Sequence, residues 1–153
     1  MEIFSGGVYS ACGWGLERES RTCGKWGVLL DYSGKIVLNF SWGLGQNTNN
    51  IAEILAIWQG LAQARRLSIK KLVVIGDSRI IIQALNLNKA PNNMGLAHYH
   101  KKVIAQLKEF EEIKCYHVLR NLNQMADHEA NKGASLSKGV ILVNGTKNHE
   151  PIP

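Results

Sequence analysis

Three acidic side chains stand where an α/β chain often places its chemistry. Glu53 lies near the start of a long helical pattern, Asp77 directly follows a short apolar run, and Asp127 falls in the first turn of a predicted final helix. Strand ends and the loops that follow them are common ligand positions in α/β sheets. Each residue also has a structural interpretation, as a helix N-cap for Asp77 and as first-turn charge for the other two. Only as a set do they predict a function.

Carboxylates in such a set suit hard divalent cations. Mg²⁺ is commonly bound by a few carboxylates together with water and substrate phosphate. Two ions about 3.5–4 Å apart can activate a water molecule and stabilise the leaving oxygen of a phosphodiester. If the three carboxylates converge on one face of a sheet, they predict metal-dependent cleavage of a nucleic-acid backbone.

The pattern of apolar residues predicts the elements that would position these side chains. After a short apolar start at residues 3–4, two apolar runs flank a turn at residues 31–34 and predict a hairpin. Helical spacing then follows the N-cap candidates Asn47 and Thr48 as far as about Arg66. The later elements are a strand at 71–75, a helix from 78 to about 87, a helix at 96–110, a strand at 113–119 and a helix from 124 to about 136.

The element order is therefore β-β-β-α-β-α-α-β-α, typical of an α/β fold. We expect a mixed five-stranded sheet with helices on both faces. Residues 1–136 form one domain in this prediction. Residues 137–153 are predicted to be a mobile C-terminal tail, because Gly, Asn, Lys and Pro dominate their composition.

Three segments resemble motifs of type-1 RNases H, and in particular of the plant and retroelement branch. Residues 48–53 (TNNIAE) look like the TNNxAE motif, and residues 76–78 (GDS) look like the DS motif after the fourth strand. Residues 117–127 (HVLRNLNQMAD) are similar to the HxxRxxNxxAD signature. The resemblance covers roughly residues 3–136, and its motifs occur in the family's order. It implies an RNase H-like fold and cleavage of the RNA strand of RNA–DNA hybrids.

Carried over residue by residue, the resemblance assigns roles to individual side chains. Its catalytic metal ligands would be Glu53, Asp77 and Asp127, which would hold two Mg²⁺ or Mn²⁺ ions. Its nucleic-acid contacts would come from six residues: Asn49, Asn50, Ser78, Arg79, Arg120 and Asn123. The two adjacent asparagines would read 2′-hydroxyls in the minor groove. His117 would be either an auxiliary catalytic histidine or a structural residue of the last strand, and the second interpretation is favoured.

The first metal-ligand position departs from the family pattern. The family carries Asp-Gly on its first strand, whereas this chain has Ser5 followed by Gly6. A hydroxyl is a poor replacement for a bridging carboxylate. Glu2 is no substitute, because it lies about 10 Å from Ser5 along the strand and on the other face. We expect weak metal binding and slow or absent cleavage; a thousandfold loss corresponds to about 4 kcal/mol of transition-state stabilisation.

Composition favours a nucleic-acid partner. The formal net charge is +6 and the pI is about 9.3, as expected of proteins with anionic partners. Basic residues cluster at Arg65, Arg66, Lys70 and Lys71. The three cysteines form no CxxC pair, and no long apolar run is present, so we expect an intracellular protein in a reducing compartment, nucleus or cytoplasm. It would act as a monomer or as part of a larger polypeptide.

Three hypotheses remain open from the sequence. The chain is an active two-metal endonuclease, a catalytically weak or inactive module that binds hybrid or RNA, or a domesticated fragment of a retroelement polyprotein. The intact TNNxAE-like segment supports the first hypothesis. Ser5 supports the other two.

Overall fold

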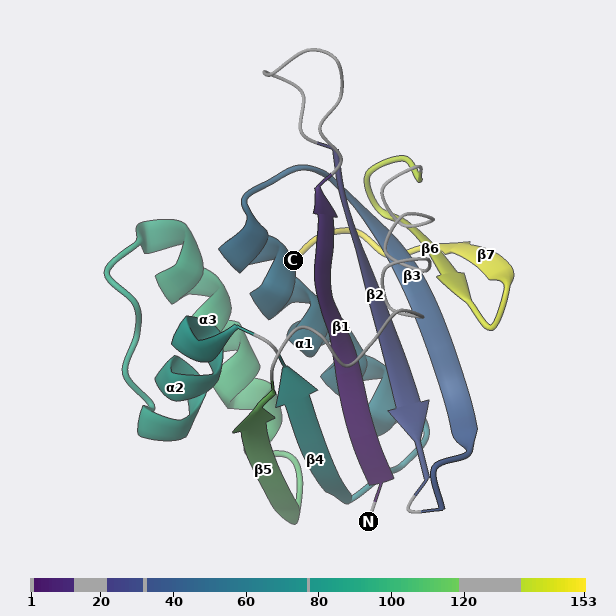
Figure 1. Cartoon of the computed structure of the whole chain (residues 1–153), viewed down its shortest axis with the longest axis horizontal. Helices are drawn as coiled ribbons and strands as arrows, with labels where there is room; N and C mark the ends of the chain where they lie inside the picture. Colours follow the sequence, from purple (N-terminus) through teal and green to yellow (C-terminus); the bar gives the residue numbers. More distant parts are fainter. Residues whose placement is uncertain (1, 13–21, 32, 77, 119–135) are drawn as a thin grey trace.

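The computed structural model describes residues 2–12, 22–31, 33–76, 78–118 and 136–153. Their strands form one seven-stranded sheet in the order β5-β4-β1-β2-β3-β6-β7 (Figure 1). The three N-terminal strands are antiparallel neighbours, namely β1 (Glu2–Cys12), β2 (Thr22–Leu30) and β3 (Ile36–Gln46). On the other side of β1, the strands β4 (Lys71–Gly76) and β5 (Glu112–His117) are parallel to it and to each other.

The predicted hairpin is confirmed between β2 and β3. The Asp31 carboxylate accepts hydrogen bonds from the backbone N–H of Ser33 and of Lys35, and from the Ser33 hydroxyl. These bonds lower the pKa of Asp31, the Ser33 side chain having the largest effect. Gly34 adopts a φ of 87°, which favours glycine. The turn chemistry therefore fixes the register in which β2 and β3 pair.

Helix α1 (Asn49–Arg66) begins where the sequence predicts it, with Thr48 as N-cap. The Thr48 side chain accepts a hydrogen bond from the Ile51 backbone N–H. The buried side chains of α1 pack with those of the strands into one core. This core includes Trp42, which is 0% exposed. Trp42 stacks on Trp58 at a centroid distance of 6.1 Å. In Figure 1, α1 lies behind the central strands, and α3 (Met94–Leu107) packs beside it.

Helix α2 (Arg79–Leu87) follows β4 and is linked to its neighbours by polar contacts. His100 of α3 is 3% exposed, and its Nε2 lies 2.9 Å from the Ala84 carbonyl oxygen. The Asn86 amide donates to the Cys115 carbonyl of β5. The predicted order of elements is confirmed as far as β5. The last predicted helix, at 124–136, falls almost entirely outside the described residues, so the prediction of helices on both faces stays a prediction.

The predicted mobile tail is wrong. Residues 140–149 form a hairpin of β6 (Val140–Val143) and β7 (Thr146–His149), and β6 pairs with β3. Ile141 is completely buried, and the Trp42 indole N–H donates to the Glu150 carbonyl at 3.0 Å. The sheet therefore has more strands than the five expected. The C-terminal residues belong to the same domain as the rest, because they cover the Trp42 edge of its core.

Candidate nucleic-acid and metal site

The carboxyl ends of β4 and β5 lie side by side, and β4 also pairs with β1. Ser5 of β1 is in register with Ile75 of β4, and Gly76 is in register with His117 of β5. The Val118 N–H donates to the Gly76 carbonyl at 2.9 Å, which extends the pairing by one residue. Asp77 lies outside the described residues, but Gly76 and Ser78 on either side of it are placed. The sequence predicts a metal-binding site at this edge of the sheet.

Glu53 is brought to this edge from α1. It lies in the second helical turn and is 3% exposed, so the alternative interpretation as first-turn charge is wrong. A Cβ on Gly76 would lie 3.2 Å from Glu53 Oε1 and 3.1 Å from Ile82 Cδ1. Such contacts are tighter than most, so the glycine before Asp77 allows the α1 carboxylate to approach the end of β4.

The buried Glu53 carboxylate has a buried cationic partner, Lys25 of β2. Lys25 is 0% exposed, and its Nζ lies 3.9 Å from Glu53 Oε2. A carboxylate or an ammonium removed from water needs a compensating charge. Glu53 is therefore buried together with a cationic side chain. Its partner is a residue to which the sequence analysis gave no role.

A signal for Lys25 was present in the sequence. Strand side chains alternate between faces, so Lys25 shares its face with Gly27 and Leu29. Leu29 is 1% exposed and Gly27 is buried. A lysine on the inward face of a strand is an exception to the polar-out pattern. It could have been identified by asking which acidic residue would pair with it.

The same alternation bears on the first metal-ligand position. Gly6 is in register with Gly27, whereas Ser5 is in register with Val28 on the next position of β2. Cross-strand partners share a face, so Gly6, rather than Ser5, lies on the face of Lys25 and Glu53. Neither residue supplies a carboxylate. The position without the family's aspartate, which the sequence assigned to Ser5, therefore corresponds better to Gly6 on this face.

The predicted nucleic-acid contacts that the structure describes lie at helix starts. Asn49 and Asn50 begin α1, and Asn50 is partly exposed. Ser78 is the N-cap of α2, where its Oγ accepts from the Ile81 N–H at 3.4 Å. The N-cap role considered for Asp77 therefore belongs to Ser78. Arg79 is exposed in the first turn of α2.

The third motif is only partly described. His117 is exposed at the end of β5 and has an interaction partner; both interpretations of its role stay predictions. Arg120, Asn123 and Asp127 lie outside the described residues, so their roles stay predictions. Among the residues that are described, no group of three or more His, Cys, Asp or Glu side chains could hold a metal ion.

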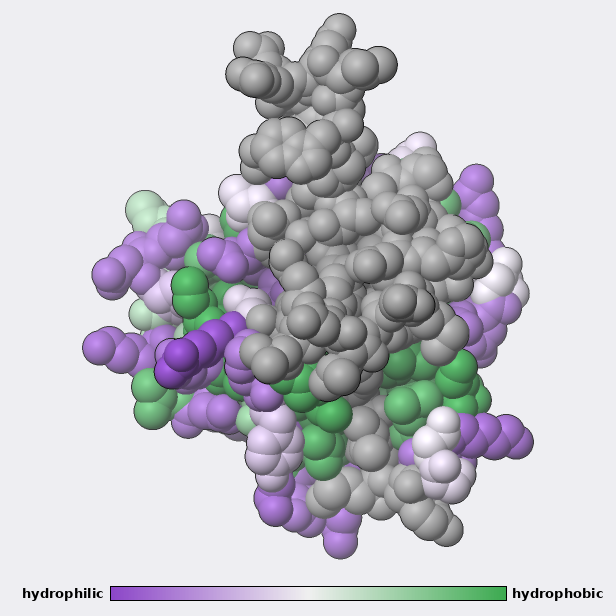
Figure 2. Space-filling model, viewed as in Figure 1, coloured by the Kyte–Doolittle hydropathy of each residue, from purple (hydrophilic) through white to green (hydrophobic). Residues whose placement is uncertain are grey.

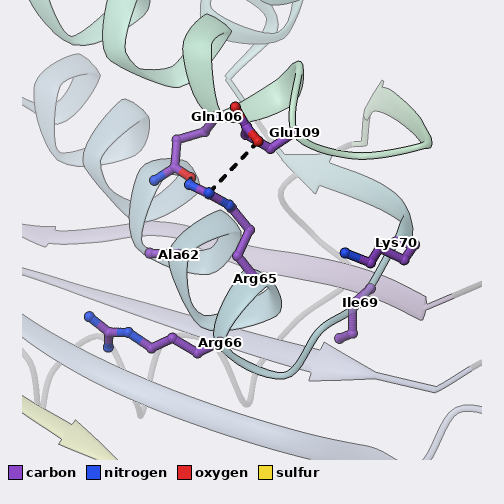
Figure 3. Close-up of a pocket in the computed structure, with 7 residues that line it drawn as sticks. All are labelled: Ala62, Arg65, Arg66, Ile69, Lys70, Gln106 and Glu109. Atoms are coloured by element: carbon purple, nitrogen blue, oxygen red, sulfur yellow. Dashed lines mark hydrogen bonds and ion pairs between the residues drawn. The ribbon is translucent and has the colours of Figure 1, made fainter.

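The basic cluster at the end of α1 lies away from this edge. Arg65 is twelve residues after Glu53, or about 18 Å along the helix axis. It contacts Gln106 at 2.8 Å and Glu109 at 3.9 Å, around an open pocket of about 410 Å³ (Figure 3). Arg66 points away from these residues in Figure 3 and pairs with Glu150 at 2.6 Å. Both arginines thus have acidic partners, which favours a structural role.

Hydrophilic side chains gather elsewhere on the surface as well. Figure 2 shows them around the rim on the side of α2 and α3. Lys101 and Lys108 are exposed there. Within the described parts of the chain, no helix is both long and apolar enough to cross a membrane.

Comparisons with known proteins agree with the motifs and the topology. No curated protein sequence matches the chain. Among solved structures, RNase H1 from the halophilic archaeon Halobacterium salinarum NRC-1 is 24% identical, with a TM-score of 0.71 over 86% of this chain and 94% of that one. LC11-RNase H1 from compost, solved in complex with an RNA/DNA hybrid, is 20% identical, with a TM-score of 0.73 over 88% and 96%.

A viral structure shares the fold within a much longer chain. The foamy viral protease-reverse transcriptase, in complex with an RNA/DNA hybrid, is 18% identical, with a TM-score of 0.68. The match covers 88% of this chain but 20% of the viral one. The family model described as "Reverse transcriptase-like" matches residues 14–133, which is most of the sequence. This chain therefore belongs to the reverse transcriptase-like family of RNase H domains, as its three motifs predicted.

Proposed function

We propose that this chain binds RNA–DNA hybrids through an RNase H-type surface and cleaves them weakly or not at all. The observation on which this rests is the composition of the strand edge beside Gly76. The Glu53 carboxylate has a buried ammonium, that of Lys25, 3.9 Å away, and the adjacent positions of β1, Ser5 and Gly6, have no acidic side chain. Binding depends on many dispersed contacts and suffers less from these changes than catalysis does.

Several observations support the binding half of the proposal. Asn50 and Arg79 are accessible at the starts of α1 and α2, and the chain carries a net charge of +6. Two of the similar structures are complexes with an RNA/DNA hybrid. The match to one fifth of a viral polypeptide further supports the hypothesis that the domain derives from a longer retroelement protein.

The binding half is tested by fluorescence anisotropy with a labelled RNA–DNA hybrid, duplex DNA and duplex RNA of one sequence. We expect tightest binding to the hybrid, with an affinity that falls at least tenfold between about 50 and 200 mM salt. Asn50→Ala should weaken hybrid binding. Asn148→Ala, an exposed asparagine on β7, is the matched control and should leave binding unchanged. Equal affinity for all three duplexes would contradict hybrid recognition.

The catalytic half is tested with the same hybrid, labelled on its RNA strand, in Mg²⁺ and in Mn²⁺. We expect cleavage by the wild type to be slow or no greater than that by Glu53→Gln. Efficient cleavage that Glu53→Gln abolishes would establish the active-endonuclease hypothesis instead. In that case Ser5 and Gly6 would not matter for catalysis.

A further inference from the structure

We infer that Cys12 and Cys23 form a redox-sensitive site, at which a low-molecular-weight disulfide such as oxidised glutathione converts the two thiols into a disulfide across the β1–β2 pair. The inference rests on the backbone register of these two strands and on the positions of the cysteines in the sequence. It does not depend on hybrid binding, so failure of the proposed function would leave it intact.

The two cysteines stand directly opposite each other on antiparallel strands. Cys12 is the last residue of β1, and its register partner is Cys23, the second residue of β2. Opposite residues of an antiparallel pair share a face of the sheet, with Cα atoms about 4.5–5.5 Å apart. The Cα atoms of a disulfide are usually about 4.4–6.8 Å apart. The register therefore gives the two residues a spacing that a disulfide can join with at most a small adjustment of the strands.

The cysteines also lie at the end of the β1–β2 pairing that gains most from a covalent bond. The register of the two strands shifts between Gly7 and Ala11. Among the described residues, two pairs follow this shift: Ala11 with Gly24, and Cys12 with Cys23. A β-bulge or similar irregularity leaves a residue unpaired and disrupts the ladder locally. A disulfide would hold together the short stretch of pairing that the irregularity separates from the rest.

The neighbouring strand places this pair beside the connection to α1. Cys23 is in register with Gly45 of β3, and Thr22 is in register with Gln46, the last residue of β3. Helix α1 begins shortly afterwards, at Asn49. Figure 1 shows these strand ends at the top, where the chain passes from β3 to α1. Oxidation would therefore tie β1 to the strand that pairs with the residues leading into α1.

The third cysteine, Cys115, is excluded from this reaction by its position. It is buried on β5, and its register partner Val74 pairs in turn with Phe4 of β1. Phe4 precedes Cys12 by eight residues, or roughly 26 Å along a strand. Burial also raises the pKa of the Cys115 thiol to about 11, and the thiolate is the reactive form. The folded chain can therefore form an internal disulfide between Cys12 and Cys23 but not with Cys115.

The reaction is thiol–disulfide exchange in two steps. The thiolate of one cysteine attacks a sulfur of oxidised glutathione, whose S–S bond breaks and releases one glutathione thiolate. The thiolate of the second cysteine then attacks the protein sulfur of the mixed disulfide and releases the second glutathione. The two thiol protons pass through water to the two released glutathione molecules. Two protein thiols are thus oxidised while one glutathione disulfide is reduced, and an excess of reduced glutathione drives the same steps in reverse.

The test compares the folded and the urea-unfolded wild-type chain in buffers of fixed reduced and oxidised glutathione at pH 8. The exchange is quenched with acid, the remaining thiols are alkylated, and tryptic peptides are analysed by mass spectrometry. Trypsin cuts after Arg18 and Arg21, so Cys12 and Cys23 leave in separate peptides that stay joined through a disulfide. We expect the folded chain to form this disulfide with an effective concentration at least about tenfold above that of the unfolded chain, for which a short flexible linker gives millimolar values. Cys115 should remain a thiol.

Thermal unfolding gives a second measurement on the same samples. A tenfold preference of the folded chain corresponds to about 1.4 kcal/mol, and by linkage it raises the melting temperature of the oxidised chain above that of the reduced chain by about 3–6 °C. Cys12→Ser, which keeps Cys23, is the matched control. It should give the mixed disulfide with glutathione, no internal disulfide and no rise in melting temperature.

Three results would overturn the inference. The first is a folded wild type that forms the Cys12–Cys23 disulfide no more readily than the unfolded chain does. The second is an internal disulfide that includes Cys115, because the register would then not select the pair. The third is an oxidised chain that melts no higher than the reduced one.

Discussion

Breaking the Lys25–Glu53 pair should have one of the largest effects on stability of any substitution outside the apolar core. At 3.9 Å the two groups are too far apart for a hydrogen bond and interact as charges. At an effective dielectric constant of about 20, their attraction is roughly 4 kcal/mol. Lys25→Met removes the positive charge that lies 3.9 Å from the buried Glu53 carboxylate. We expect a loss of about 3–5 kcal/mol in the free energy of unfolding at neutral pH.

The pairwise part of this loss is measured by a double-mutant cycle. Glu53→Gln alone leaves a buried ammonium and should also destabilise the protein by several kcal/mol. The variant with both substitutions buries neither charge and should be more stable than the sum of the single losses implies. We expect a coupling energy of about 1–3 kcal/mol. Urea unfolding followed by tryptophan fluorescence reports it, because Trp42 and Trp58 stack within the core.

Lys71→Met is the matched control, since Lys71 is exposed. Its effect should be within about 0.5 kcal/mol. A Lys25→Met protein as stable as this control, with additive losses in the cycle, would refute the argument from burial. It would mean that water reaches the pair and screens it.

Three further predictions concern other parts of the fold. Gly76→Ala should lower the free energy of unfolding by about 1–3 kcal/mol in urea, because the added Cβ would lie 3.1 Å from Ile82 Cδ1 and 3.2 Å from Glu53 Oε1. Unchanged stability would show that these two neighbours move easily. Ile141→Ala should cost about 2–5 kcal/mol, because Ile141 is completely buried on β6, in register with Trp42 of β3, whereas Thr146→Ala on exposed β7 should cost less than about 0.5 kcal/mol. Equal effects would argue against a packed C-terminal hairpin. Burial raises the pKa of Cys115 to about 11, so mass spectrometry should find this thiol unalkylated in native protein at pH 8. Since the unfolded thiol ionises near pH 9 and the folded one near 11, stability should fall by up to about 1.4 kcal/mol per pH unit between these values; a rise there would contradict the burial.

The sequence predicted those parts of the fold that local chemistry determines. Thr48 caps α1, and the Asp31 turn joins β2 to β3, because these residues use their own side chains to satisfy nearby backbone groups. The sequence also placed Glu53 near the start of a helix, where the structure has it in α1; its role as a metal ligand stays a prediction. Asp77 and Asp127, the other predicted ligands, lie outside the described residues and stay predictions.

The parts that were missed depend on contacts between residues far apart in the chain. The C-terminal hairpin has a local signal, an apolar run at 140–143 before Asn144-Gly145, which is a common hairpin turn. The polar composition around it obscured that signal, and its burial depends on Trp42 about one hundred residues earlier. Lys25 was missed for a related reason, because its role exists only once β2 and α1 are packed together.

The hairpin also determines what the sheet presents to other molecules at its far side. Without β6 and β7, the outermost strand there would be β3, a long strand. A long unpaired edge is a template for β-aggregation. Instead, the outermost strand is β7, which has four residues, all exposed and polar, among them Lys147. We expect these last residues to keep the chain soluble, so that a chain ending at Ser137 would sediment as oligomers where the full chain remains monomeric.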